Sequence, residues 1–328
     1  MSRQPVLVTG ATGFLGRNLA PYLVERGHRL RALVRPHTDS AFLEPLGVER
    51  AWGDLGEPDS VAAAVSGCRA VVHAAGLFRF WGKRQDFFAV NVAGTHCLLE
   101  AAREAGVERF VHISTVAVVG KPPPGRWIGE ETACHPQDAY QESKLEAERL
   151  ALDFYRQYGL PVVILRPGAY YGPWGRYGFN RLFFEDPLKG LAVQVHRGRH
   201  VIFPVYIEDV AQAAELALQQ GRPGEIYNIC GACLSHRAAN QVVARLAGRP
   251  IRWRDVPGWS MVALSRLWTW LARFTAREPY YPLGLYSYVF YDWRVDSQKA
   301  RRELGFAPTS FEEGARRTVE WYRSQGIF

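Results

Sequence analysis

The stretch Val6-Leu7-Val8-Thr9-Gly10-Ala11-Thr12-Gly13-Phe14-Leu15-Gly16 predicts the fold of this chain of 328 residues. Its first four residues form an apolar, strand-like run, and three glycines follow at intervals of three. Residues 14–26 then carry apolar side chains at helical spacing. A glycine turn between a strand and a helix exposes backbone amides and the positive end of the helix, and it leaves room for a pyrophosphate. The stretch therefore predicts a dinucleotide site.

Strand-like runs and helical segments alternate along the rest of the first half. The runs lie at 30–34, 48–52, 70–73, 109–114, 162–165 and 225–229, and the helical segments lie at about 57–66, 84–105 and 138–158. This alternation predicts a parallel sheet that helices cover on both faces. The predicted fold class is α/β, a Rossmann-type doubly wound parallel sheet. We expect residues 1–167 to form the dinucleotide-binding core, rejoined by segments near 201–231, and residues 168–328 to form a smaller, mainly substrate-binding part.

Composition excludes several other classes of protein. Hydrophobic residues make up 48% and charged residues 22%, as in a folded globular protein, and the net charge of +8 comes from scattered arginines without a basic block, so we expect no nucleic-acid partner. The five cysteines are odd in number and widely spaced, which indicates a cytoplasmic protein without a disulfide framework. Cys230 and Cys233 form a lone C-x-x-C, for which small core residues are favoured over a zinc site, and we expect no metal. We also expect no leader and no membrane span, since no apolar run approaches about 20 residues.

The residues after the second predicted strand bear on the choice of cofactor. An NAD enzyme normally offers Asp or Glu to the adenosine ribose there, whereas this chain has Val34-Arg35-Pro36-His37. The Arg35 guanidinium suits a ribose 2′-phosphate through paired charge-assisted hydrogen bonds. The alternative is an exposed arginine that only stacks on adenine. The sequence therefore favours NADP over NAD as the cofactor.

A second motif, Tyr140-Gln141-Glu142-Ser143-Lys144, indicates proton transfer. Tyr140 and Lys144 lie one helical turn apart on the same face of a predicted helix. A tyrosine hydroxyl has a pKa of about 10 in water, and a neighbouring ammonium stabilises the phenolate. We therefore expect the Tyr140 pKa to be lowered. Ser114-Thr115 follows the fifth strand, at the edge of the sheet where ligands of parallel sheets bind.

These motifs resemble those of the extended short-chain dehydrogenases/reductases, the NAD-dependent epimerase/dehydratase superfamily, and especially its 3-beta-hydroxysteroid dehydrogenase-like branch. The matching stretches recur in family order at 9–16, 53–55, 73–76, 91–95, 114–120, 140–144, 166–168 and 206–210. The resemblance implies the catalytic residues Thr115, Tyr140 and Lys144, with Thr115 selected over Ser114 by its spacing from Gly120. It also implies that Asn91 braces the sheet. Cofactor contacts are expected from Gly10, Thr12, Gly13, Phe14, Leu15, Arg35, Asp54, Leu55, Ala74, Ala75, Gly76, Tyr140, Lys144 and Pro167.

Departures from the nucleotide-sugar pattern favour an apolar substrate. Val119-Gly120 stands where those enzymes carry Tyr-Gly, and no asparagine follows the sixth strand. Aromatic residues gather instead in the loops expected around the cleft. The predicted substrate residues are Phe78, Trp81, Tyr170, Trp174 and Tyr206. We therefore predict an NAD(P)-dependent oxidoreductase that interconverts a secondary alcohol and a ketone on a small lipophilic substrate, which is steroid-, terpenoid- or oxo-acyl-like.

Two other functions and one segment remain open at this level. The chain could be a nucleotide-sugar epimerase or dehydratase with tightly bound NAD, or a non-catalytic protein that senses dinucleotides. Residues 259–274 mix tryptophan and leucine with arginine at helix-compatible spacing. They could form a lid over an apolar substrate, a peripheral membrane contact or a core helix. The resemblance also implies a homodimer through the helices that follow the fourth and fifth strands.

Overall fold

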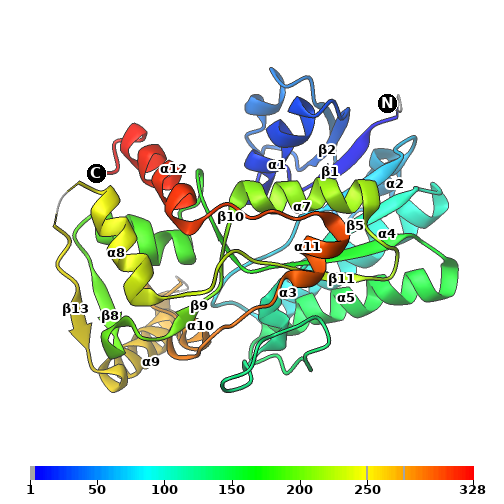
Figure 1. Ribbon diagram of the computed structural model, residues 1–328. Coiled ribbons are helices and arrows are strands. Elements are labelled where there is room, and N and C mark those ends of the chain that lie inside the picture. Colours follow the sequence, from blue (N-terminus) through cyan, green and yellow to red (C-terminus); the bar gives the residue numbers. More distant parts are fainter. Residues whose placement is uncertain (1–3, 249, 276–277) are drawn as a thin grey trace.

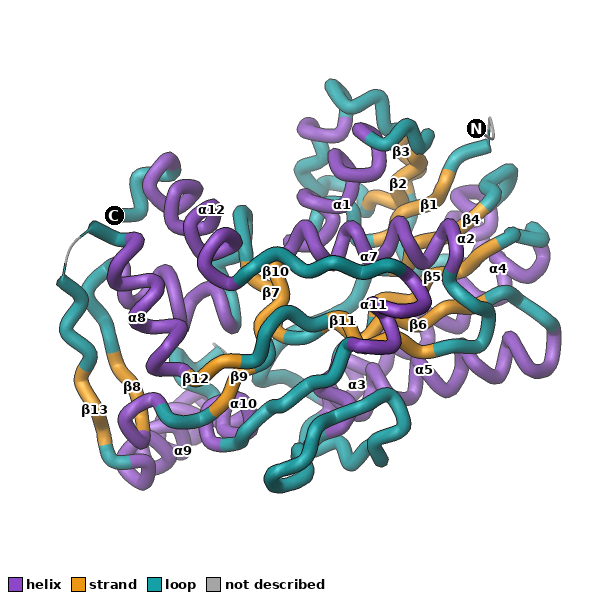
Figure 2. The backbone as a smooth tube through the Cα atoms, in the orientation of Figure 1, coloured by secondary structure: helices purple, strands orange, loops and turns teal. Residues whose placement is uncertain are grey.

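A parallel seven-stranded sheet forms the centre of the molecule in the computed structural model, which describes residues 4–248, 250–275 and 278–328 (Figures 1 and 2). The strands run in the order β11-β6-β5-β4-β1-β2-β3. They are β1 (Val6–Thr9), β2 (Leu30–Val34), β3 (Glu49–Trp52), β4 (Ala70–His73), β5 (Arg109–Ile113), β6 (Val162–Pro167) and β11 (Ile226–Ile229). The predicted Rossmann-type fold class is thus confirmed, and the run predicted at 225–229 does join the main sheet.

Alternate residues of β1 face opposite layers, which explains why this strand is continuously apolar. Val6 and Val8 pack into a cluster with α1 (Phe14–Glu25) and α7 (Ile207–Gln220) on one face of the sheet. Leu7 packs into a second cluster on the other face, with α2 (Pro58–Val65), α4 (Gly94–Glu104) and α5 (Ala139–Tyr158). Because both faces are covered, no position of the strand tolerates a polar side chain without a partner.

The helix predicted over 84–105 is divided in three. α3 (Arg84–Phe88) and α4 are joined by a π-helical turn at Ala89–Ala93, where Asn91 is buried. Its side chain accepts a hydrogen bond from the Leu77 amide at 2.7 Å and donates to the Leu77 carbonyl at 3.1 Å and to the Ser143 hydroxyl at 2.9 Å. Asn91 thereby ties the loop after β4 to α5, rather than bracing the sheet itself.

Two polar contacts fix α5. Asp138 caps its first turn by accepting a hydrogen bond from the Gln141 amide at 2.8 Å. Further along, Glu148 forms a buried ion pair of 2.6 Å with Arg166 on β6. These contacts fix the position of Tyr140, which lies in the first turn of the helix, relative to the carboxyl edge of the sheet.

Most of the remaining elements build the C-terminal part (Figure 1). Three small sheets pair β7 (Ala169–Tyr171) with β10 (Pro204–Tyr206), β9 (Val201–Ile202) with β12 (Leu234–Ser235), and β8 (Val193–Val195) with β13 (Arg254–Val256). Its helices are α6 (Asp186–Leu188), α8 (His236–Leu246), α9 (Gly258–Thr275), α10 (Tyr286–Phe290) and α12 (Phe311–Ser324). Helix α11 (Gln298–Leu304) instead packs against α7 and β11, beside the main sheet. The domain boundaries predicted from sequence stay a prediction.

Candidate active site

A cavity of about 750 Å³ lies at the carboxyl edge of the main sheet. Its wall begins at Thr9, at the end of β1, and continues through the loop after β4, Thr115 after β5 and Gly168 after β6. Segments of the C-terminal part close the opposite side, including Phe183, Tyr288 and Val289. Ligands of open parallel sheets bind at this edge.

The glycine loop forms one end of the cavity. Gly10 has a φ of +72°, and a Cβ there would lie 2.7 Å from the Ala75 nitrogen. Only glycine therefore allows the backbone at this position to approach the loop that follows β4. Gly13 faces the cavity, and a Cβ there would meet only the Gly10 oxygen at 3.3 Å. No described side chain caps the first turn of α1, so its amides remain available to an anion. This geometry fits a dinucleotide pyrophosphate.

Nearly all the residues expected to contact a cofactor lie on this wall. Arg35, Asp54 and Leu55 line the end next to β2, where Arg35 is exposed and pairs with no carboxylate among the described residues. Two expected contacts do not reach the wall. Pro167 is buried within β6, and the neighbouring Gly168 lines the cavity in its place. Lys144 lies behind the wall; the other expected residues on it are Gly10, Thr12, Gly13, Phe14, Leu15, Ala74, Ala75, Gly76 and Tyr140.

Thr115 and Tyr140 face the cavity together, and the Thr115 hydroxyl acts to lower the pKa of the phenol against the larger effect of burial. The Thr115 oxygen also accepts a hydrogen bond from the Ala117 amide at 3.1 Å, which orients its side chain. Ser114, the adjacent candidate, is buried away from the cavity, and its hydroxyl has no partner among the described residues. The geometry therefore agrees with the choice of Thr115 over Ser114.

Burial governs the acid–base properties of both members of the Tyr–Lys pair. The Lys144 side chain is buried, its ammonium donates to the Ile113 carbonyl at 2.7 Å, and burial lowers its pKa to about 8. Burial also raises the pKa of Tyr140 well above its usual value, and the nearby Tyr170 and Tyr288 add to this rise. The expectation of a lowered Tyr140 pKa is therefore wrong, because loss of water around the phenol dominates its pKa, and only the Thr115 hydroxyl acts in the opposite direction.

An aromatic wall surrounds the Tyr140 ring. The ring centroid of Phe78 lies 4.8 Å from that of Tyr140, and Phe80 lies 5.4 Å from Tyr177 and 5.6 Å from Tyr288. Phe78 was predicted from sequence, whereas Tyr177 and Tyr288 were missed because no motif marks the segments that carry them. The space next to the phenol is thus lined mainly by ring faces and edges.

The five predicted substrate residues divide into two groups. Phe78 and Tyr170 line the cavity, as expected. Trp81, Trp174 and Tyr206 are not among the residues that line it, so their substrate role stays a prediction. Trp174 packs on Trp321 at the surface with a centroid distance of 5.7 Å, and Tyr206 is buried in the core, where its hydroxyl lies 3.2 Å from Glu208.

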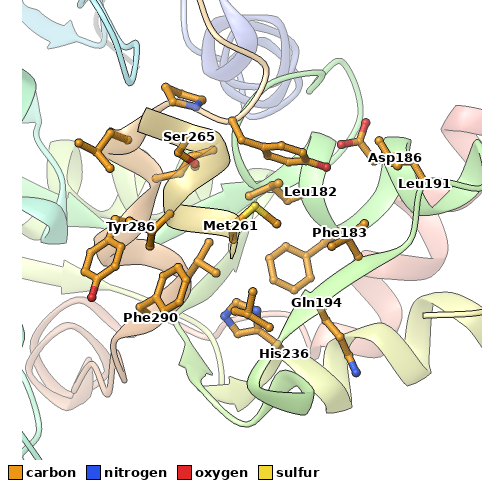
Figure 3. A pocket seen from close by; sticks show the side chains of 18 of the residues that line it. Leu182, Phe183, Asp186, Leu191, Gln194, His236, Met261, Ser265, Tyr286 and Phe290 are labelled. Atoms are coloured by element: carbon orange, nitrogen blue, oxygen red, sulfur yellow. The ribbon is translucent and has the colours of Figure 1, made fainter. Parts of the chain in front are cut away.

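A side pocket of about 70 Å³ adjoins the cavity beneath α9 (Figure 3). The two share Leu182, Phe183 and His236 as walls. Most of the lining is apolar, but four buried polar atoms have no partner within residues 4–248, 250–275 and 278–328: Asp186 Oδ2, His236 Nε2, Asn240 Oδ1 and Trp253 Nε1. Burial lowers the pKa of His236 to about 4, so this side chain is neutral at pH 7. The side pocket could therefore accept an uncharged hydrogen-bonding group.

Comparison with known proteins identifies the family. Residues 6–230 match the model of the NAD dependent epimerase/dehydratase family. The chain belongs to this family. It is 34% identical to sterol demethylase protein B of Methylococcus capsulatus over 98% of this chain and 99% of the relative. It is 31% identical to a 3 beta-hydroxysteroid dehydrogenase/Delta 5-->4-isomerase of Mycobacterium tuberculosis over 92% of this chain and 86% of the relative.

Solved structures agree with this assignment. A dTDP-glucose 4,6-dehydratase from Streptomyces venezuelae, crystallised with NAD, superposes with a TM-score of 0.79 at 28% identity, covering 98% of this chain and 97% of that one. Relatives in the family include dehydrogenases, reductases and dehydratases. We conclude that the chain is an enzyme of this NAD-dependent superfamily.

Proposed function

We propose that the protein is an NADP-preferring oxidoreductase that interconverts a secondary alcohol and a ketone on a lipophilic substrate. One observation carries the proposal. The hydroxyls of Thr115 and Tyr140 share a single cavity with an open glycine loop at one end and an aromatic wall around the phenol. A glycine loop alone would serve a binding protein equally well, whereas two converging hydroxyls supply a means of polarising a carbonyl and moving its proton.

The glycine loop, Arg35 and the residues after β4 would hold the dinucleotide. When bound, a nicotinamide cofactor supplies or accepts a hydride. The chain's own residues then act on the oxygen of the substrate. Thr115 and Tyr140 donate hydrogen bonds to it, and Tyr140 gives or takes the proton. The raised pKa of Tyr140 keeps the phenol protonated at neutral pH, as proton donation to a ketone requires.

We infer a different role for Lys144. It lies one turn along α5 from Tyr140, with its ammonium held by the Ile113 carbonyl behind the wall. From this position it would stabilise negative charge on the phenol during proton transfer. Contact with the ribose next to the nicotinamide would require its ammonium to leave the Ile113 carbonyl.

The preference for NADP rests on Arg35. Its exposed guanidinium lies on the cavity wall directly after β2, in the place where an NAD enzyme normally carries Asp or Glu. The Asp54 carboxylate on the same wall follows β3 instead, and it accepts a hydrogen bond from the Gly56 amide at 2.9 Å. Arg35→Ser should weaken NADPH binding by about 10-fold or more and leave NADH binding within about 2-fold, since a charge-assisted hydrogen bond contributes about 1.5–3 kcal/mol. Titration calorimetry with both cofactors measures this. Equal losses for NADPH and NADH would contradict the assignment.

The lipophilic character of the substrate rests on the lining of the cavity. Phe78, Phe80, Tyr177 and Phe183 offer apolar surface in the cavity that Tyr140 faces, and the described wall contains few charged side chains. The names of the relatives point the same way, since two of them are a sterol demethylase protein and a hydroxysteroid dehydrogenase. We therefore propose a steroid-, terpenoid- or oxo-acyl-like compound.

A cofactor-oxidation screen tests the proposal. NADPH and NADH consumption would be followed against panels of sterol ketones, oxo-acyl compounds and sugar nucleotides, with the wild type and Tyr140→Phe side by side. We expect turnover of a lipophilic ketone that falls at least about 100-fold in Tyr140→Phe, while cofactor affinity stays nearly unchanged. Wild-type turnover in that variant would refute the mechanism.

The same screen decides the second candidate. Similarity to a dTDP-glucose 4,6-dehydratase keeps a nucleotide-sugar epimerase or dehydratase in view. Such an enzyme would retain NAD through purification and convert a sugar nucleotide without net consumption of cofactor. We also propose a homodimer formed through α4 and α5, which light scattering after size-exclusion chromatography would detect.

A further inference from the structure

Helix α9 turns its large apolar side chains away from the protein. Trp259 and Phe274 are 75% and 74% exposed, and Leu267 and Trp270 are 51% and 52% exposed. At about 100° per residue these four side chains fall on one side of the helix. Leu264 and Leu271, which are 40% and 45% exposed, widen the same side. We call this set of six residues the α9 outer face.

The opposite side of α9 is smaller and more polar. Ser265 is buried there, and Met261, Val262 and Ser265 line the side pocket (Figure 3). Thr269 lies on the same side and donates to the Ser265 carbonyl at 2.7 Å. A surface helix of a globular protein normally has the reverse arrangement, with its apolar stripe toward the core. The α9 outer face is therefore a contiguous apolar surface without a partner in the described chain.

Charge around the helix identifies the kind of partner. Between Asp255 and Glu278 the sequence contains no Asp or Glu. Arg266 on α9 is exposed, as are Arg252 and Arg254 beside its N-terminal end. Tryptophan, leucine and phenylalanine bordered by arginine is the composition of a helix that lies in the headgroup region of an anionic membrane.

We propose that α9 docks on the surface of an anionic lipid bilayer, with its outer face in the boundary between headgroups and acyl chains. The helix would lie in the membrane plane, since no helix among the described residues is long and apolar enough to cross a bilayer. Figure 1 shows α9 at an outer corner of the C-terminal part, where a flat surface can reach it. A second copy of this chain is a less suitable partner. Arg266 lies at the middle of α9, so two-fold symmetric pairing through this helix would bring two Arg266 side chains together, and their positive charges would repel each other.

Docking would place the side pocket next to the bilayer. Met261 and Val262 form its wall on the inner side of α9, and Phe183 and His236 connect it to the cavity that holds Tyr140. A lipophilic molecule could then pass from the membrane beneath α9 to the active site. This route rests on the proposed function, whereas the docking itself does not.

Vesicle sedimentation tests the docking without any turnover. The purified full chain would be mixed with vesicles of phosphatidylcholine alone, or with a third of phosphatidylglycerol, and the bound fraction measured after centrifugation. We expect binding to the anionic vesicles that weakens at least 10-fold in partition coefficient in the triple variant Trp259→Ser, Trp270→Ser and Phe274→Ser. Trp127→Ser is the matched control, because Trp127 is 59% exposed and lies outside α9.

Each other outcome overturns the proposal. Absence of binding to either vesicle would show that no membrane covers α9. Binding that survives in the triple variant, or falls equally in Trp127→Ser, would place the contact elsewhere. Dimerisation that the triple variant abolishes, without vesicle binding, would assign the outer face to a second copy. Circular dichroism and thermal unfolding check that the variants fold, as expected for solvent-facing positions.

Discussion

Replacement of Gly13 by alanine separates the cofactor role of the glycine loop from its structural role. Gly13 precedes α1 with φ −79° and ψ −179°, a conformation that alanine adopts without strain. The added methyl would meet only the Gly10 oxygen, at 3.3 Å, and would otherwise project into the cavity. We therefore expect the free energy of unfolding to change by less than about 1 kcal/mol, because two effects oppose each other. Alanine is a poorer N-cap than glycine, which destabilises the protein, but it also lowers the conformational entropy of the unfolded chain, which stabilises the folded state.

Cofactor binding should change much more. A methyl group at this position would hold the pyrophosphate off the amides of the first turn of α1, and one lost charge-assisted hydrogen bond corresponds to about 1.5–3 kcal/mol. Dissociation constants for NADPH should then rise roughly 10- to 150-fold. Titration calorimetry measures the affinity, and urea unfolding measures the stability.

Two glycines serve as controls for this variant. Gly16→Ala should prevent folding, because its Cβ would lie 2.2 Å from the Gly10 oxygen. Gly129→Ala, where nothing lies within 4 Å of the added atom, should change neither quantity. Unaltered NADPH affinity in a folded Gly13→Ala protein would refute the position assigned to the pyrophosphate.

Two further predictions concern α5. Arg166→Met leaves Glu148 buried without its partner, so the free energy of unfolding measured in urea should fall by about 3–5 kcal/mol. Replacing both residues by methionine should recover most of this loss. A double variant as unstable as the single one would contradict the ion-pair explanation. The Lys144 pKa is about 8 in the folded protein against 10.5 for the free side chain, so the folded state binds fewer protons between these values and stability should rise with pH there. The free energy of unfolding should rise by at most about 1.4 kcal/mol per pH unit in this range, and Lys144→Met should remove the rise. If the variant keeps the pH dependence of the wild type, another group is responsible.

The sheet and the cofactor end of the site could be predicted from the sequence because their signals are local. The glycine triplet, the alternation of strands and helices, and the pair Tyr140 and Lys144 each lie within one short segment. Their positions follow from the fold class, since the carboxyl ends of parallel strands share one edge. Asp138, the residue that caps α5, also lies next to the motif that it positions.

The substrate end could not be predicted in the same way. Tyr206 belongs to a strand of three residues, in which a shift of one position moves a side chain to the other face. Tyr288 reaches Tyr140 from 148 positions along the chain, through packing that no local pattern records. The raised pKa of Tyr140 has the same origin, because it depends on how many distant residues exclude water from the phenol.

The hydrogen bonds of Asn91 to Leu77 and Ser143 have a consequence for how the substrate specificity of such an enzyme can change during evolution. The Asn91 amide group holds both the amide and the carbonyl of Leu77 and also contacts Ser143 on α5, whereas Phe78 and Phe80 lie immediately beyond the held residue. Substitutions at positions 78 and 80 can thus change the shape of the cavity while α5, which carries Tyr140, stays in place. The backbone position of the loop therefore does not depend on which side chains stand at 78 and 80. A change of Phe78, whose ring lies 4.8 Å from that of Tyr140, would still alter how far water is excluded from the phenol, whereas Phe80 is the position at which the cavity can vary with less effect on Tyr140.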